Sequence, residues 1–199
     1  MMSKDHFDPS CFGDAVAMQT LWVPMSSGGI NFDTHEMVIV SSYRIEFKAL
    51  PILYFSYITG IIIFTLIATI LNDKKESLFL LFAVFILAVS FPRHSARSVF
   101  DKRKMLFWKG RSEYDFYIDT HFKKIARLYD IHAIQLLYKV VENEDGTDDD
   151  NYELNIILND SRRINIVSYT KKDDIRRDAA FLAEFLRKPL WDAIDLQSA

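Results

Sequence analysis

Cysteine is almost absent from this chain of 199 residues, and neither sign of charge dominates it. Cys11 is the only cysteine, so no disulfide can form within the chain, which suits a reducing compartment. The formal net charge of −3 gives no global field that favours nucleic acid as a partner. The first 30 residues contain no apolar run of the kind found in signal peptides, so we expect no cleavable secretory signal.

Motifs that hold phosphates, metals or catalytic nucleophiles are also lacking. Gly28 and Gly29 belong to no G-x-x-x-x-G-K or G-x-G-x-x-G loop and indicate a turn, and no G-x-S-x-G elbow is present. The five histidines form no H-x-x-x-H pair, so no metal site is expected. We therefore expect no catalytic residue, no cofactor and no metal. An enzyme would need a site assembled from distant residues, such as His121, His132 and an acidic run.

That acidic run, between Glu142 and Glu153, is the one cluster that suggests a cation site. If Gly146 took the sixth position of an EF-hand loop, Tyr152 would fall at the twelfth position, where a bidentate Glu is required. The run therefore predicts a solvated loop over residues 142–151.

Two long stretches without charge are the strongest feature that is present. Residues 49–71 have no charged side chain over 23 positions, about 34 Å of helix, which exceeds the ~30 Å of a bilayer core. Residues 78–91 span only 14 positions, so Arg93 and Arg97 would have to reach toward the headgroups, and a buried core helix is the alternative. Because the connection of residues 72–77 is short, we predict a transmembrane helical hairpin.

The positive-inside rule gives this hairpin an orientation. Two lysines, at positions 74 and 75, lie at its tip. Seven cations flank its other end: Arg44, Lys48, Arg93, Arg97, Lys102, Arg103 and Lys104. We therefore expect a multi-pass protein of the cell inner membrane with both termini in the cytoplasm.

The remainder of the chain predicts β-strands and one helix. Residues 43–47 alternate polar with apolar side chains and can join a sheet formed by the later part of the chain. Strands are also expected at 98–100, 105–108, 114–118, 131–141, 152–158 and 162–167. An amphipathic helix over residues 171–188, capped by Thr170, follows them, and Trp191 is expected to pack against the domain.

The predicted domain order is an N-terminal cytoplasmic segment with strands (1–48), a transmembrane helix (49–71), an external loop (72–77), a second transmembrane helix (78–92), a β-rich domain (93–192) and a tail (193–199). The turn at 101–104, the hairpin at 152–167 and the closing helix resemble the pleckstrin-homology-like (PH-like) domains of small bacterial two-span membrane proteins, the YcxB-like and YdbS-like groups. The resemblance implies an α+β membrane protein with a PH-like cytoplasmic domain, and it implies no reaction.

A basic cluster with interleaved aromatics carries the functional prediction. Its candidate contact residues for anionic lipid headgroups or a protein partner are Arg93, Arg97, Lys102, Arg103, Lys104, Trp108, Lys109 and Arg111. A juxtamembrane cluster of this kind gains about 1 kcal/mol per cation near anionic lipid. The alternative is that these charges only set membrane orientation.

The first uncharged stretch also contains a small-xxx-small pair, Ser56 and Gly60. Such pairs pack helices together, either within the hairpin or in a homodimer. The combined prediction is a membrane-anchored, non-enzymatic interaction module at the cytoplasmic face. The alternatives are an accessory subunit of a transporter or envelope complex and an immunity-type protein against a membrane toxin.

Overall fold

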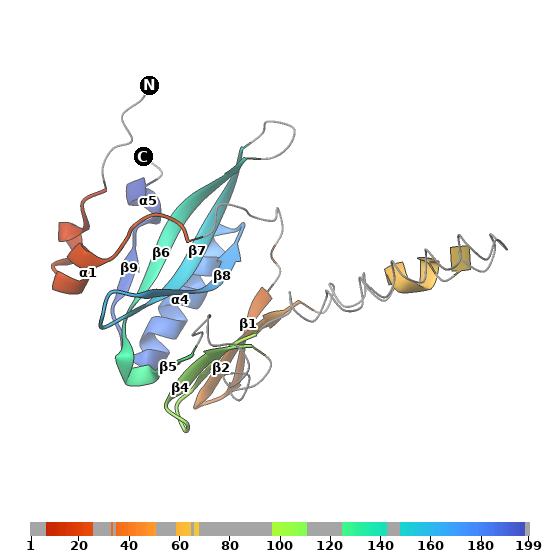
Figure 1. Cartoon of the computed structure of the whole chain (residues 1–199), viewed down its shortest axis with the longest axis horizontal. Coiled ribbons are helices and arrows are strands. Elements are labelled where there is room, and N and C mark those ends of the chain that lie inside the picture. Colours follow the sequence, from red (N-terminus) through yellow and green to blue (C-terminus); the bar gives the residue numbers. More distant parts are fainter. Residues whose placement is uncertain are drawn as a thin grey trace.

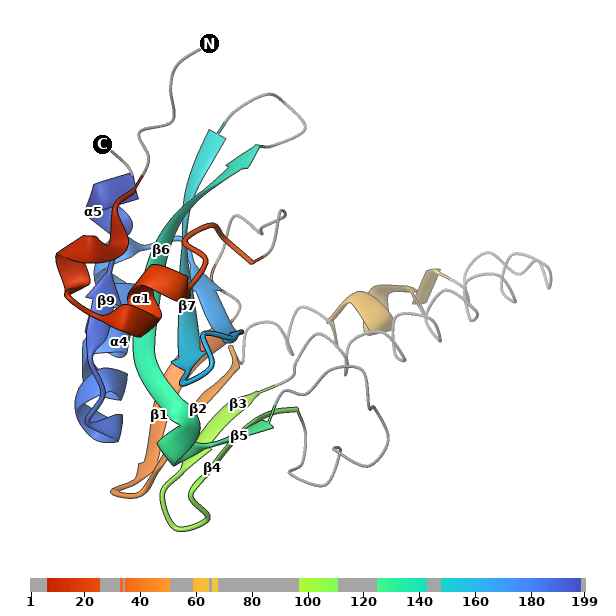
Figure 2. The same ribbon diagram turned by 60° about the vertical axis from the view of Figure 1, so that its left-hand side comes forward.

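The computed structural model describes residues 7–25, 33, 35–50, 59–64, 66–67, 97–110, 125–142 and 148–197. These residues form two β-sheets with one long helix and a folded N-terminal segment (Figures 1 and 2). The first sheet is a meander in chain order. Its strands are β1 (His35–Ser41), β2 (Arg44–Ala49), β3 (Ser98–Asp101), β4 (Leu106–Lys109) and β5 (Ile125–Arg127).

The second sheet has the order β8-β7-β6-β9. Its long central pair consists of β6 and β7, and β9 runs parallel to β6 at one edge. The strand bounds are β6 (Ile131–Glu142), β7 (Asp148–Leu158), β8 (Arg163–Tyr169) and β9 (Leu190–Asp192). A 3₁₀ turn, η3 (Leu128–Asp130), connects the two sheets between β5 and β6.

Helix α4 (Lys172–Leu186) covers one face of the second sheet. Its buried stripe includes Ile175, Ala179 and Leu182, which recur at helical spacing. These side chains join a single hydrophobic core that also receives residues of the first sheet, such as Phe47 and Phe107. The short helix α5 (Ile194–Gln197) follows β9.

The N-terminal segment packs beside β9 and β6 (Figures 1 and 2). It contains η1 (Pro9–Phe12) and α1 (Ala15–Gln19), capped by Asp8 and Asp14 respectively. A second, smaller hydrophobic cluster forms there from Ala17, Ala133, Ile157 and Trp191. The predicted packing of Trp191 against the domain is confirmed, because its side chain is 2% exposed.

The fold class predicted from the sequence, a transmembrane hairpin followed by a PH-like domain, is wrong. In the part of the chain that the structure describes, no helix is long and apolar enough to cross a membrane. A lack of charge shows only that a stretch tolerates an apolar environment, and it does not fix an uninterrupted helix. The predicted multi-pass inner-membrane location with cytoplasmic termini depended on those helices and is corrected with them.

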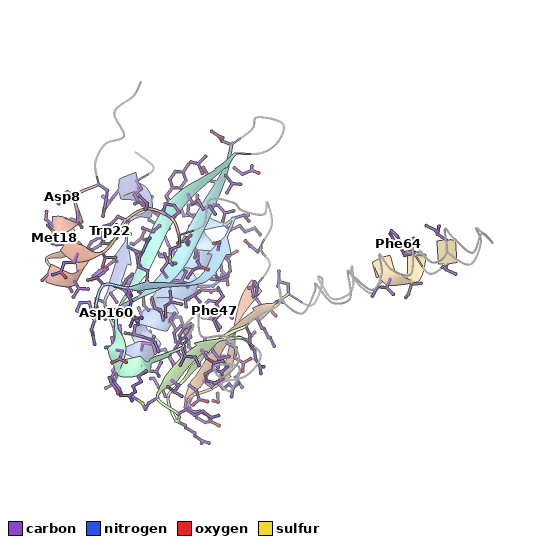
Figure 3. All side chains as sticks on the ribbon, in the orientation of Figure 1. Asp8, Met18, Trp22, Phe47, Phe64 and Asp160 are labelled. Carbon is purple, nitrogen blue, oxygen red and sulfur yellow. The ribbon has the colours of Figure 1, made fainter. Side chains whose placement is uncertain are left out.

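Little of the two uncharged stretches falls among the described residues. Residues 59–64 and 66–67 are helical and lie apart from both sheets, as the side chain of Phe64 shows in Figure 3. Residues 51–58 and 78–91 lie outside the described residues, as does the strand predicted at 114–118.

Several local predictions are confirmed. The hairpin around residues 101–104 is the β3–β4 pair, and the hairpin around 159–161 is the β7–β8 pair. The long strand at 131–141 is β6, and the amphipathic helix is α4. Strand β2 pairs with β3, so the expected joining of the N-terminal strands to the later part of the chain is also confirmed.

Two local predictions are wrong. Lys171, not Thr170, occupies the N-cap of α4, and the hydroxyl and N–H of Thr170 instead donate to Asp33 Oδ1 at 3.1 and 2.7 Å. The predicted solvated loop over residues 142–151 is too long, because Asp148 and the two aspartates after it pair with the end of β6. The β-prone residues Val140 and Val141 extend the ladder into the acidic run.

Candidate functional site

The turn between β3 and β4 is organised by one buried carboxylate. Asp101 is 4% exposed, and its Oδ1 accepts the backbone N–H groups of Arg103 and Lys104 at 2.9 and 3.0 Å. Met105 closes the turn in the left-handed region, with φ of 53°. Aspartate is favoured here because its side chain satisfies N–H groups that the ladder leaves free. The two cationic side chains are consequently held on the outside of the turn.

Backbone hydrogen bonds join the neighbouring turns to this one. Lys102 N–H donates to Tyr43 O at 2.8 Å, and Leu128 N–H donates to Met105 O at 2.9 Å. The guanidinium of Arg103 lies over the ring of Tyr43, 3.6 Å from its centroid. The ends of three strand connections thus form one prearranged surface, which lowers the entropy lost when a partner binds.

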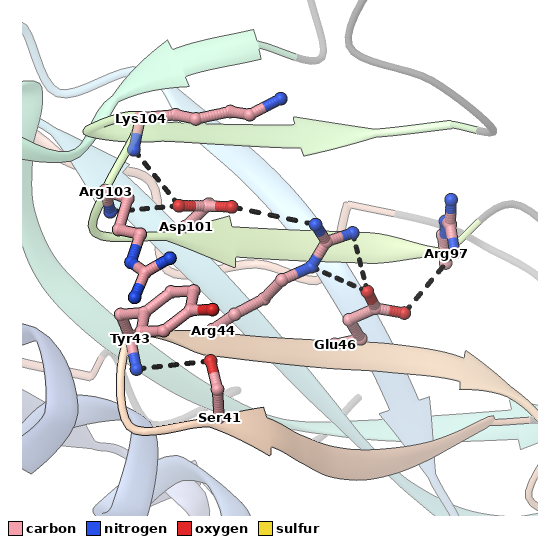
Figure 4. A network of polar contacts seen from close by, with 8 residues as sticks. All are labelled: Ser41, Tyr43, Arg44, Glu46, Arg97, Asp101, Arg103 and Lys104. Carbon is pink, nitrogen blue, oxygen red and sulfur yellow. Dashed lines mark hydrogen bonds and ion pairs between the residues drawn. The ribbon is translucent and has the colours of Figure 1, made fainter.

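Arg44 lies between two buried carboxylates on this surface (Figure 4). Its Nη2 is 2.7 Å from Glu46 Oε1, and its Nη1 is 3.6 Å from Asp101 Oδ2. Arg97 Nη1 reaches the other oxygen of Glu46 at 3.5 Å. Glu46 is only 7% exposed, so both acids are screened by their partners. The charge presented to solvent around them is therefore cationic.

Trp108 lies on the same face and has an unusual property. Its side chain is 4% exposed, and the cationic groups of Arg44 and Lys104 lie 5.4 and 5.8 Å from the ring centroid. Its Nε1–H is the one buried side-chain polar atom without a hydrogen-bond partner in the part of the chain that the structure describes. An unpaired buried donor costs about 1–3 kcal/mol of stability, so an oxygen acceptor from a ligand would recover that energy.

Exposed apolar side chains accompany these cations. Val40 and Met105 are 52% and 47% exposed. Apolar contact area next to Arg, Tyr and Trp is the usual composition of the centre of a protein interface. We name this region the hairpin-end surface and define it by Val40, Tyr43, Arg44, Arg103, Lys104, Met105 and Trp108.

The structure brings together three residues of the predicted basic cluster, Arg103, Lys104 and Trp108. The ammonium of Lys102 lies elsewhere, over the ring of Phe185 in α4, 4.1 Å from its centroid. Lys109 has a different role, because it points to the second sheet. Its Nζ donates to Asn165 O at 3.0 Å, Asn165 Oδ1 at 3.2 Å and Ile166 O at 3.1 Å. Lys109 therefore links the two sheets.

Other predicted site residues are only partly placed. Arg93, Arg111 and Ser56 lie outside the described residues, and Gly60 lies in the helical residues 59–64. The helix-packing face of Ser56 and Gly60 therefore stays a prediction. The structure adds Tyr43 and Glu46, which the sequence did not single out. An available signal was the spacing of Arg44 and Glu46, two residues apart on one face of a strand.

Titratable groups away from this surface have structural explanations. Burial raises the pKa of Asp178, although the Tyr169 hydroxyl donates to its Oδ2 at 2.8 Å and Arg177 pairs with it. Burial also raises the pKa of Tyr169, and the charge of Asp178 and the hydrogen bond to it raise that pKa further. Among the described residues no three His, Cys, Asp or Glu side chains are placed to hold a metal ion. No protein-family model matches the chain, and no curated protein sequence is significantly similar to it.

Proposed function

We propose that this chain is a non-enzymatic interaction module that binds an acidic segment of a protein partner at the hairpin-end surface. The observation that carries the proposal is the buried, unpaired Nε1–H of Trp108, whose ring centroid lies 5.4 and 5.8 Å from the cationic groups of Arg44 and Lys104. A carboxylate is the protein group that would satisfy that donor and the adjacent positive charge together.

Trp108 is reached past the side chains that lie over its ring, those of Arg44 and Lys104. The Lys104 side chain lies over the indole ring and follows a turn fixed by Asp101, so the side chain can rotate while the backbone stays in place. The surrounding cations would speed association with an acidic partner, and Val40 and Met105 would supply apolar contact.

A charge-reversal titration tests this proposal. The full chain is titrated against a short fluorescent poly-glutamate peptide, and Arg103→Glu is compared with Arg162→Glu. Arg162 is a matched control because it is an exposed turn arginine that pairs with Asp160 in the β7–β8 connection. We expect Arg103→Glu to weaken binding about ten-fold and Arg162→Glu to change it little.

Three results would count against the proposal. They are no saturable binding of the peptide, an equal loss in both variants, and binding to vesicles of anionic lipid with none to the peptide. The last result would assign the cations to a lipid surface. A photoreactive side chain at Val40 should also crosslink to a protein partner that the same group at Asp160 does not capture.

A further inference from the structure

The face of the second sheet opposite α4 is crossed by an extended part of the chain's own N-terminal segment. We call residues 20–25 the strap. Side chains from three elements donate to its successive carbonyls: Gln135 Nε2 to Leu21 O at 3.2 Å, Gln197 Nε2 to Trp22 O at 2.6 Å and Arg163 Nη1 to Val23 O at 2.6 Å. The sheet therefore holds the main chain of the strap, which contributes no strand to either sheet.

A buried carboxylate holds the end of the strap. The N–H of Met25 donates to both oxygens of Glu153, at 3.0 and 3.1 Å. Glu153 is 0% exposed and also accepts Asn155 Nδ2 at 2.8 Å. Burial lowers the pKa of the neighbouring Lys139, an effect that the charge of Glu153 opposes. The strap thus lies on a polar strip of the sheet that includes Glu153 and Gln135, and we call this strip the groove.

The strap is held with little use of its side chains. Leu21, Val23 and Met25 are 66%, 61% and 45% exposed. Two side chains of the strap are inserted. Thr20, 5% exposed, donates its hydroxyl to Val16 O at 2.8 Å, and the ring of Trp22 is stacked 5.0 Å from Phe12 with its Nε1–H donating to Ala17 O at 2.9 Å. The contacts that the sheet makes with the strap are therefore mainly to its main chain, and Trp22 is its one inserted aromatic side chain.

The groove residues also hold one another. Asn155 Nδ2 donates to Gln135 Oε1 at 3.4 Å, and Asn165 Nδ2 donates to Asn155 Oδ1 at 3.3 Å. Lys109 continues the series to the first sheet through Asn165 Oδ1. The donors and acceptors that meet the strap are thus oriented by the sheets, as in a preformed binding site.

An empty groove would leave Glu153 and Gln135 without their strap partners, which favours replacement of the strap over its simple release. Residues 26–29, directly after the strap in the sequence, are two serines followed by two glycines. The next described residue, Asp33, is held by two hydrogen bonds from Thr170. A second copy of the chain offers a matching segment by identity of sequence.

We propose that this groove is a peptide-binding site and that a second copy of the chain fills it by exchanging residues 7–25. Such segment exchange adds no new type of contact, because each groove receives the same atoms from the partner copy. It does not depend on the hairpin-end surface, so it stands independently of the function proposed above.

The first test uses a fluorescent peptide with the sequence of residues 7–25 and the full chain as acceptor. The chain's own strap competes at high effective concentration, so Trp22→Ala in the chain should raise its affinity for the peptide about ten-fold or more. Leu21→Ala is the matched control and should behave as the wild type, since that side chain is 66% exposed. A peptide carrying Trp22→Ala should not bind.

The second test asks for the second copy. Cys11 is exposed and is the only cysteine, so a donor dye can be attached there. The acceptor dye goes on Arg162→Cys in a chain that also carries Cys11→Ser. We expect energy transfer after mixing at high concentration, and its loss when excess unlabelled peptide is added.

Two results would overturn the proposal. One is failure of the peptide to bind a Trp22→Ala chain that circular dichroism shows to be folded. The other is peptide binding together with a failed exchange test. The exchange test fails if energy transfer between chains is absent or if the peptide does not reduce it. If Trp22→Ala does not fold, Gln197→Ala replaces it as the weakened acceptor, because it removes only the bond to Trp22 O and one to Tyr138 N–H.

Discussion

Among single residues, Trp108 and Trp22 are a matched pair that separates a binding role from a structural one. Trp22 donates its Nε1–H to Ala17 O, whereas that of Trp108 has no partner among the described residues. We expect Trp22→Phe to lower the free energy of unfolding by about 1 kcal/mol more than Trp108→Phe does, because only Trp22 loses a hydrogen bond. Urea unfolding measures both.

The same two variants have opposite expectations for binding. Trp108→Phe should weaken poly-glutamate binding several-fold while leaving stability close to that of the wild type, and Trp22→Phe should leave this binding unchanged. Equal effects of the two variants on both properties would remove Trp108 from the proposed site.

The contact of Asp14 with His132 makes the packing of the N-terminal segment against β6 sensitive to acid. Burial tends to raise the pKa of Asp14, but the bond from His132, at 2.7 Å, and that from Val16 N–H outweigh it and lower the pKa below 3.8. A carboxyl group whose pKa is lower in the folded than in the unfolded state stabilises the fold at pH values above its unfolded-state pKa. That contribution is lost as the pH falls through the folded-state pKa. Asp14→Asn should therefore flatten the decline of stability below about pH 4. Unfolding measured against pH tests this, with Glu184→Gln on the exposed side of α4 as control.

Among the strands and turns, the sequence predicts what depends on near neighbours. The β3–β4 and β7–β8 hairpins and α4 follow from alternation, turn residues and helical spacing within short windows. The cap of α4 was mispredicted because Thr170 bonds Asp33, which is distant in sequence. The strap had no signal at all, since an extended segment held by side chains has neither the period of a strand nor that of a helix.

The β3–β4 turn can be tested against a matched turn in the same molecule. Asp101 is 4% exposed, accepts two backbone N–H groups and pairs with Arg44. Asp160 accepts one N–H, that of Arg162, at 3.2 Å in an exposed turn. We expect Asp101→Ala to cost about 2 kcal/mol and Asp160→Ala under about 0.5 kcal/mol in unfolding free energy. Similar losses would show that the buried carboxylate does not organise the turn.

In the molecule as a whole, the error in the predicted fold class has a physical cause. Composition showed where charge was missing, but it did not show that residues 35–49 pair with residues on the far side of both uncharged stretches. That pairing closes a sheet over a long sequence separation, which no local window contains. The hairpin-end surface depends on it, because Tyr43 and Arg44 meet Arg103 and Asp101 only through the β2–β3 ladder.

The two sheets share one core, so we expect them to unfold together. Phe107 of β4 is 0% exposed and belongs to the same cluster as Leu154 of β7 and Leu182 of α4. Phe107→Ala should cost about 3–5 kcal/mol, and Phe181→Ala, at a side chain 38% exposed, should cost much less. Hydrogen exchange read by mass spectrometry should then show peptides of β1–β4 and of β6–β8 losing protection by the same factor in Phe107→Ala. If β6–β8 kept the protection of the wild type, the sheets would be separate cooperative units and the shared core would contribute little to holding them together.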